Sequence, residues 1–340
     1  MTNNKFTATN SSYEIKRIVW RSGVLIAFAF IALFSIGISL VIGAVNISLP
    51  DIIQAIILKG TSIKGQIIWN IRLPRTFVGA LVGLNLALSG AILQAVMKNP
   101  LADPHIIGIS SGAGLAGIIV LVLFPTLDYM LTPVAFIGAL GAAALIYFLA
   151  WKGGIRPIRI ILAGVAVSAF LGSGISALLV LYSDRVHGAL MWMVGGLTAR
   201  SWSHVYIIFP YTICGSILAF WGAKHLNVLS LGDEVARGLG LRVEATRIMM
   251  TAIAALLAAS SVSVVGLLGF VGLIVPHAAR LLLGSDYRFL LPASALLGIS
   301  VVTLSDTLTR ILFSPIELPV GIIMAFIGAP FFLYLLRRES

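Results

Sequence analysis

Long uninterrupted apolar runs dominate the hydrophobic pattern of this 340-residue chain. A helix that crosses a bilayer needs about 20 apolar residues, and the chain contains ten candidate runs: 23–45, 76–97, 106–124, 131–151, 157–182, 204–223, 244–264, 266–283, 289–311 and 319–337. Membrane barrels alternate apolar and polar residues, and these runs do not. The pattern predicts an all-α integral membrane protein of about ten transmembrane helices, with residues 1–22 as an N-terminal segment and residues 23–340 as one transmembrane domain.

The boundary between the seventh and eighth runs is the least marked. Only the small-residue segment SSVSVVG, residues 260–266, separates them, and it carries no charge. We interpret it as a turn; a continuous helix would reduce the count to nine. Pairs of glycines four residues apart, Gly79 with Gly83 and Gly108 with Gly112, indicate places where helix backbones approach closely in lipid.

Composition and charge support a membrane location and suggest an orientation. Residues are 59% hydrophobic and 10% charged, whereas a soluble domain carries about 25% charged residues. The net charge of +11 fits basic cytoplasmic loops rather than nucleic-acid binding. With the N-terminus inside, 16 of the 23 lysines and arginines lie inside and seven outside, namely Lys59, Lys64, Arg72, Arg75, Arg185, Arg200 and Arg310. We therefore expect both termini in the cytoplasm.

Chemistry-bearing side chains are scarce inside the predicted spans. The twelve acids fall almost entirely in loops or at span ends, with Asp306, late in the ninth run, as the nearest exception. Carriers driven by protons or sodium usually keep ionisable groups within the membrane. The segment GISSGAG lacks the Lys-Ser/Thr ending of a P-loop, and the histidines and single cysteine show no metal-ligand spacing. We expect no enzyme activity, no metal and no cofactor, with energy supplied by another chain; a secondary carrier or channel working alone is the alternative.

A polar segment between the sixth and seventh runs predicts a short helix at about residues 230–241. Ser230 is a candidate cap, acids lie near the helix start, and glycine suits its end. Arg237 follows Asp233 at the i+4 spacing of a helical ion pair. We interpret this helix as a docking element for a cytoplasmic partner, with a solvated interfacial helix as the alternative.

Blocks along nearly the whole chain resemble the FecCD-type permease subunits of type II ABC importers for ferric siderophores, haem and vitamin B12. In order, they are IRLPRT, LSGAILQAVMKNPLADPHIIGISSGAG, ILAGVAV, MVGGL, LGDEVARGLGL, GFVGLIVPHAARLL and ELPVGIIMAFIGAPFFLYLL. The resemblance implies ten spans in a prokaryotic cell membrane. It also implies a second permease subunit, identical or paralogous, two cytoplasmic ATPases that use the ATP, and an extracytoplasmic binding protein. It favours a ferric siderophore without excluding haem or cobalamin.

The resemblance also implies roles for particular residues. Arg72, Arg75 and Arg310 would dock acidic residues of the binding protein, with interfacial snorkelling as the alternative. The coupling helix that contacts the ATPase would contain Gly232, Asp233, Glu234, Arg237 and Gly240. The fifth run and the segment ALMWMVGGLTARSW would line the pathway, which gives as pathway or gate residues Arg156, Pro157, Ile158, Met191 and Met193. Some relatives carry small hydroxyl residues where Pro157 and Ile158 stand, so a bulkier apolar constriction is a hypothesis.

Overall fold

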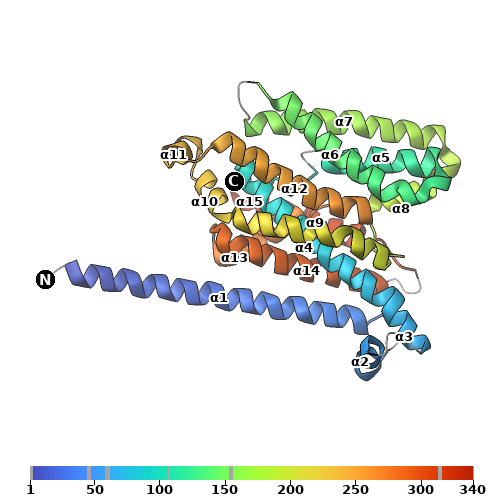
Figure 1. The fold of residues 1–340 in the computed structure, drawn as a ribbon, viewed down its shortest axis with the longest axis horizontal. Coiled ribbons are helices and arrows are strands. Elements are labelled where there is room, and N and C mark those ends of the chain that lie inside the picture. The colour runs from blue at the N-terminus through green and yellow to red at the C-terminus, as the bar shows by residue number, and fades with distance from the viewer. Residues whose placement is uncertain are drawn as a thin grey trace.

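The computed structural model describes residues 3–43, 47–57, 62–105, 108–152, 156–312 and 316–339, and these contain helices and no strand. Figure 1 shows them as a bundle of roughly parallel helices. Their bounds are α1 Asn3–Val41, α2 Leu49–Ile57, α3 Ile63–Ile67, η1 Ile68–Arg72, α4 Leu73–Met97, α5 Ile109–Leu123, η2 Pro125–Met130, α6 Leu131–Ala150, α7 Pro157–Leu181, η3 Ser183–Arg185, α8 Val186–Val194, α9 Trp202–Trp221, α10 Ala223–Ser230, α11 Asp233–Gly238, α12 Val243–Val265, α13 Val271–Leu283, α14 Tyr287–Leu312 and α15 Val320–Glu339.

The prediction of about ten membrane helices is confirmed. Seven described helices are long and apolar enough to cross a bilayer, and three shorter apolar helices, Ile109–Leu123, Val271–Leu283 and Val320–Tyr334, account for the remaining runs. The helix α1 is continuous from Asn3 to Val41, so the expected boundary between the N-terminal segment and the transmembrane domain, after residue 22, lies within this helix. Residues 1 and 2, the expected end of the first run at 44–45 and the expected start of the third at 106–107 lie outside the described residues.

Three helices form the centre of the bundle. In the 18-residue apolar stretch of each span, 78% of the residues are buried in the spans that contain α4 and α12, and 61% in α14. The corresponding share is only 22% in α1 and 17% in α7. Burial removes apolar side chains from contact with lipid and packs them against one another at interior density. The helices α1 and α7 therefore present most of their surface to lipid or to other chains, while α4, α12 and α14 hold the fold together.

The prediction of a turn at SSVSVVG is wrong. Residues 260–265 complete α12, and the chain turns only from Gly266 to Phe270, both at positive φ. The buried serines can be accommodated in the helix because their hydroxyl groups donate to carbonyl oxygens one turn back, as Ser261 does to Leu257 at 3.1 Å. Two separate helices still follow, as the ten-run count requires.

Two of the four paired glycines lie where helix backbones meet. A Cβ atom on Gly83 of α4 would lie 2.2 Å from the carbonyl oxygen of Gly298 in α14, and one on Gly112 of α5 would lie 2.3 Å from that of Gly138 in α6. Gly79 contacts a leucine side chain instead, and Gly108 is the left-handed residue before α5. Small residues thus set the distance between α4 and α14.

Substituting Gly83 with alanine should destabilise the bundle, because the new methyl group meets backbone that cannot move aside. We expect Gly83→Ala to lower the free energy of unfolding by about 1–3 kcal/mol, the usual cost of overpacking. Thermal unfolding of the detergent-solubilised protein measures this. The matched control is Gly141→Ala in α6, where a Cβ meets nothing within 4 Å; equal melting temperatures for the two variants would contradict the close contact.

Candidate functional site

Two arginines bind backbone carbonyl oxygens at the C-terminal end of α1. Arg72, at the end of η1, donates from Nη1 to the carbonyl oxygens of Leu40 and Val41 at 2.7 and 2.8 Å. Arg310, near the end of α14, donates from Nη1 to the carbonyl oxygens of Ser39 and Ile42 at 3.1 Å each. The last carbonyls of a helix lack intrahelical partners and carry its negative dipole end. Both guanidinium groups therefore stabilise the end of α1 and fasten it to α4 and α14.

Arg75 binds two acidic side chains from later in the chain. Its Nε and Nη2 donate to the carboxylate of Asp306 in α14, at 3.0 Å to Oδ2 and 2.9 Å to Oδ1, and its Nη1 donates to Glu317 Oε2 at 2.7 Å. Arg310 Nε lies 3.4 Å from the same Asp306 carboxylate. Two-point contacts of this kind are the strong form of the arginine–carboxylate pair. We call Arg72, Arg75, Arg310, Asp306 and Glu317 the arginine network.

The network places the three predicted docking arginines together, but inside the protein. Arg72, Arg75 and Arg310 are 5%, 6% and 6% exposed, and their guanidinium groups already bond within the chain. Glu317 is its most open member, with its side chain 34% exposed. The sequence reading noted Asp306 only as an exception and missed Glu317 as a partner. The position of Asp306 four residues before Arg310 was the available signal, because that spacing puts both on one face of a helix.

The predicted short helix exists as α11, anchored by Asp233. The carboxylate of Asp233 accepts a hydrogen bond from Lys98, the residue after α4. It also accepts from Arg247 Nη2, in the first turns of α12, at 3.0 Å to Oδ1 and 3.2 Å to Oδ2. Burial raises the pKa of Asp233, but the hydrogen bonds and charges of Lys98 and Arg247 outweigh it and hold the pKa below its ordinary value. Asp233 is therefore ionised at neutral pH and ties α11 to two central helices.

Two details of the predicted helix differ in the structure. Ser230 does not cap α11; its hydroxyl donates to the carbonyl of Asn227, and Gly232, at φ 113°, precedes the helix instead. Arg237 is exposed, and the partners of Asp233 are Lys98 and Arg247 rather than Arg237. These partners come from distant segments, so the helical spacing could not identify them. Gly240 follows the helix at φ 82°, as the predicted stop requires.

One face of α11 leaves apolar side chains in the open. Val235 of α11 and Leu239 directly after it are exposed, as is Leu231 at the end of α10, whereas Ala236 of α11 is fully buried. Glu234 and Arg237 are exposed beside them. A run of exposed apolar residues rimmed by charge is typical of a protein-binding surface.

The predicted pathway residues lie in two separate places. Arg156 precedes α7 as its N-cap residue and Pro157 begins the helix, while Met191 and Met193 lie in α8, after the other end of α7 (Figure 1). Ile158 and Met191 are exposed, and Met193 packs against a small apolar cluster that includes Ile118 and Ile175. The structure therefore does not bring the five residues into one site.

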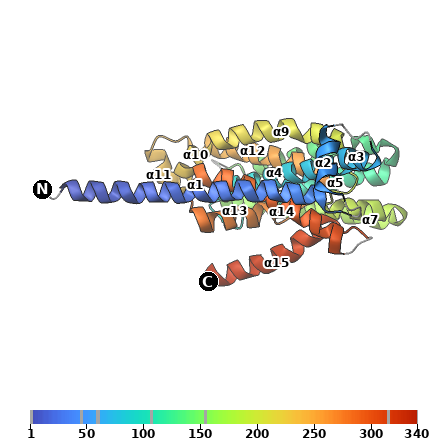
Figure 2. The same cartoon turned by 90° about the horizontal axis from the view of Figure 1, so that it is seen from below.

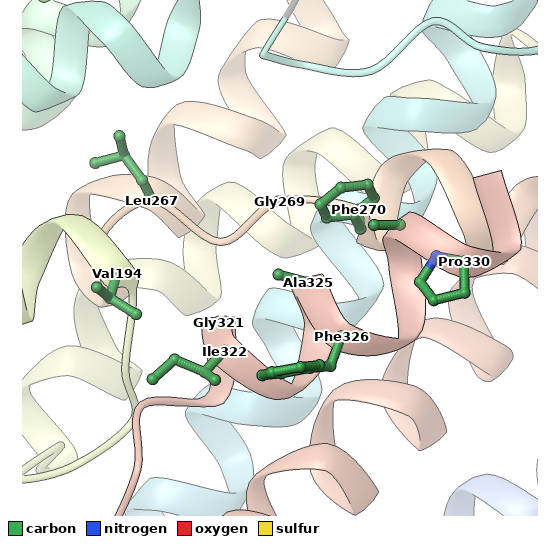
Figure 3. Close-up of a pocket in the computed structure, with 10 residues that line it drawn as sticks. Val194, Leu267, Gly269, Phe270, Gly321, Ile322, Ala325, Phe326 and Pro330 are labelled. Atoms are coloured by element: carbon green, nitrogen blue, oxygen red, sulfur yellow. The ribbon is translucent and has the colours of Figure 1, made fainter. Parts of the chain in front are cut away.

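An apolar groove of about 670 Å³ runs along α15. Figure 2 shows α15 leaving the bundle at an angle, and Figure 3 shows Ile322, Phe326 and Pro330 on this helix, with Phe270 from the turn before α13 beside it. Val194, from the end of α8, lines the other end of the groove. The backbone of α15 is also hydrogen-bonded to the segment that follows α8, since Gly321 N donates to Gly195 O at 3.1 Å.

A bundle of about ten apolar helices, most of them long enough to cross a bilayer, is the fold of a helical integral membrane protein. The model of the FecCD transport family matches residues 31–338. The chain therefore belongs to this family, whose members are permease subunits of ABC importers.

Individual relatives agree with this assignment. The chain is 41% identical over 308 residues to the Fe(3+)-citrate import system permease protein YfmD of Bacillus subtilis, which covers 91% of this chain and 92% of the relative. It is 44% identical over 275 residues to the cobalamin import system permease protein BtuC of Halobacterium salinarum, covering 81% and 74%. A solved inward-facing structure of a metal-chelate type ABC transporter superposes with a TM-score of 0.84 at 30% identity, covering 93% of this chain and 99% of that one.

Removing the central carboxylate should test the arginine network. Asp306→Asn leaves Arg75 buried with a weaker partner, and breaking a buried ion pair from one side costs about 3–5 kcal/mol. We expect a large fall in the melting temperature of the purified protein. The control is Asp184→Asn, which removes an exposed carboxylate from the pair with Arg185 and should leave the melting temperature unchanged; the same small effect in both variants would contradict a structural role for Asp306.

Proposed function

We propose that this chain is the transmembrane permease subunit of an ABC importer that moves a ferric siderophore or a related iron complex into the cytoplasm. The observation that carries the proposal is the short helix α11, which leaves apolar side chains exposed. Asp233 anchors this helix to α4 and α12. An iron complex is favoured by the Fe(3+)-citrate permease among its relatives. The cobalamin relative has comparable identity, so haem or cobalamin import on the same architecture is the second candidate.

The proposed assembly contains a second permease subunit, two cytoplasmic ATPase subunits and an extracytoplasmic binding protein. The distribution of basic residues favours both termini in the cytoplasm. With that orientation, in a prokaryotic cell membrane, the α11 end is cytoplasmic and the arginine network is extracytoplasmic. In this arrangement the ATPases hydrolyse the ATP, and the permease itself has no enzyme activity and no cofactor.

The surfaces that one chain leaves open are the ones a second permease would complete. Ile158 at the start of α7 is exposed, so an apolar gate there needs side chains from the partner subunit. The groove along α15 is apolar and lies near Val194, in the segment expected to line the pathway. A weakly binding apolar wall suits a transporter, because tight binding would retain the cargo.

Reconstitution tests the proposal directly. Vesicles that contain the permease and its ATPases should take up the ferric complex only with ATP and the binding protein present. The permease alone should transport nothing; uptake by the permease alone along an ion gradient would instead support the secondary carrier.

The apolar face of α11 should be needed for the ATPase to bind. Val235→Asp places a charge in the proposed interface, where an unpaired buried charge is strongly unfavourable. We expect at least a tenfold loss of ATPase subunit binding in a pull-down from detergent, with the permease still folded. Val235→Leu keeps the surface apolar and is the matched control. Normal ATPase binding by Val235→Asp would exclude this face as the docking surface.

Glu317 should compete with the binding protein for Arg75. An incoming carboxylate would compete with Glu317, which accepts a hydrogen bond from Arg75 Nη1 at 2.7 Å. A partly exposed ion pair contributes up to about 1 kcal/mol, so Glu317→Gln should tighten binding-protein docking by up to about fivefold. Surface plasmon resonance on the nanodisc-embedded complex measures this affinity. Unchanged or weaker docking would show that Arg75 is not a docking residue and serves the fold alone.

A further inference from the structure

A polar pocket of about 640 Å³ lies between the start of the membrane segment of α1 and the turn that joins α13 to α14. Asp286 of this turn bonds to Asn227 of α10, and α10 leads into α11 at one end of the bundle (Figure 1). Its lining contains three arginines and one carboxylate, which leaves two excess positive charges, and consists of Arg17, Ile18, Arg21, Ser285, Asp286, Arg288 and Phe289. Nothing in the transport cycle proposed above uses it.

Arg21 builds the wall of this pocket. It is buried, its Nε donates to the carbonyl of Leu283 at the end of α13 at 3.1 Å, and its Nη1 donates to Asp286 Oδ2 at 3.3 Å. The guanidinium carbon lies 4.9 Å from the ring centroid of Phe289. These contacts fix α1 against the turn.

The single carboxylate of the pocket is already saturated. Asp286 accepts hydrogen bonds from Arg288 Nη2 at 2.7 Å, Asn227 Nδ2 at 2.8 Å and Arg21. The hydrogen bond from Arg288 is the largest cause that holds the pKa of Asp286 below its ordinary value, against the opposing effect of burial. Asp286 therefore stays ionised but has little capacity to neutralise a third arginine.

Arg17 is that third cation. It is exposed, one helical turn before Arg21, and makes no hydrogen bond or ion pair with the side chains and backbone that the structure describes. Its Nη2 lies 3.7 Å from the position that a Cβ on Gly284 would occupy, and Arg21 Nη2 lies 3.6 Å from that same point. Two guanidinium groups thus converge on the turn, an arrangement that favours an anion between them.

The surroundings indicate that the anion belongs to a lipid. Ile18, Val19 and Trp20 are all exposed on α1, and Trp20 Nε1 donates to the carbonyl of Leu282 at 3.2 Å. Tryptophan at the start of a span marks the headgroup level of a bilayer, and basic pockets between helices at this level suit lipid headgroups. A free anion would need no such apolar rim.

A second cavity shares Arg288 with this pocket. It has a volume of about 420 Å³ and combines Lys224 and His225 with the apolar walls of Phe220, Trp221 and Pro292. Acyl chains require apolar surface next to the phosphate-binding group, and this cavity provides it.

We propose that Arg17, Arg21 and Arg288 bind the headgroup phosphate of an anionic phospholipid at this end of the bundle. The lipid would neutralise the pocket and hold α1 to the α13–α14 turn. The inference does not depend on the cargo or on the transport activity.

Lipid retention by the full chain tests this site. The protein is purified from nanodiscs of phosphatidylcholine with a minor share of phosphatidylglycerol, and bound lipid is counted by native mass spectrometry. Each interfacial cation contributes about 1 kcal/mol to binding of an anionic surface, so Arg17→Gln should lower phosphatidylglycerol retention about fivefold. Arg17 is exposed, so the variant should fold normally. The matched control is Lys16→Gln, the neighbouring exposed cation, which does not line the pocket.

Three results would overturn the proposal. One is equal retention by Arg17→Gln and the unmodified chain. Another is displacement of the lipid by excess inorganic phosphate, which would assign the pocket to a free anion. The third is loss of retention when the ATPase subunits bind, which would assign the same arginines to a protein interface.

Discussion

Three buried arginines at one end of the bundle must keep their charges satisfied within the protein, and the positions of α1, α4 and α14 follow from this requirement. Water is scarce at these positions, so an unpaired guanidinium group would be strongly unfavourable. Arg72 and Arg310 use the free carbonyls at the end of α1, and Arg75 uses Asp306 and Glu317. Each solution joins two segments that are far apart in sequence.

One central helix, α4, connects this network to α11. Arg75 lies near the start of α4, and Lys98, directly after its end, binds Asp233 of α11. The 25 residues of α4 form a rod of about 37 Å, packed against α14 at the Gly83–Gly298 contact. The helix that carries Arg75 is therefore linked to α11 through the Lys98–Asp233 ion pair.

The sequence predicted most of the fold and only part of the candidate site. The apolar runs identified the membrane helices because the length of a span is a local property of the sequence. The error at SSVSVVG arose because helix carbonyls can also accept a hydrogen bond from a buried serine hydroxyl group, so small polar residues do not by themselves end a buried helix. In α11 the sequence indicated the helix and the role of Asp233 as an acid near its start, but it suggested Arg237 as the partner, because only spacing within the helix was visible.

By itself, the sequence determined the class of protein, the approximate number of membrane spans and the family, because hydrophobicity and the order of motif blocks are properties of the linear chain. Only the tertiary structure decided which charges meet. Asp306 lies 231 residues after Arg75, and Asp286 lies 265 after Arg21. Such pairs form because helix packing brings segments together in a medium where every charge needs a partner, and no local pattern encodes that geometry.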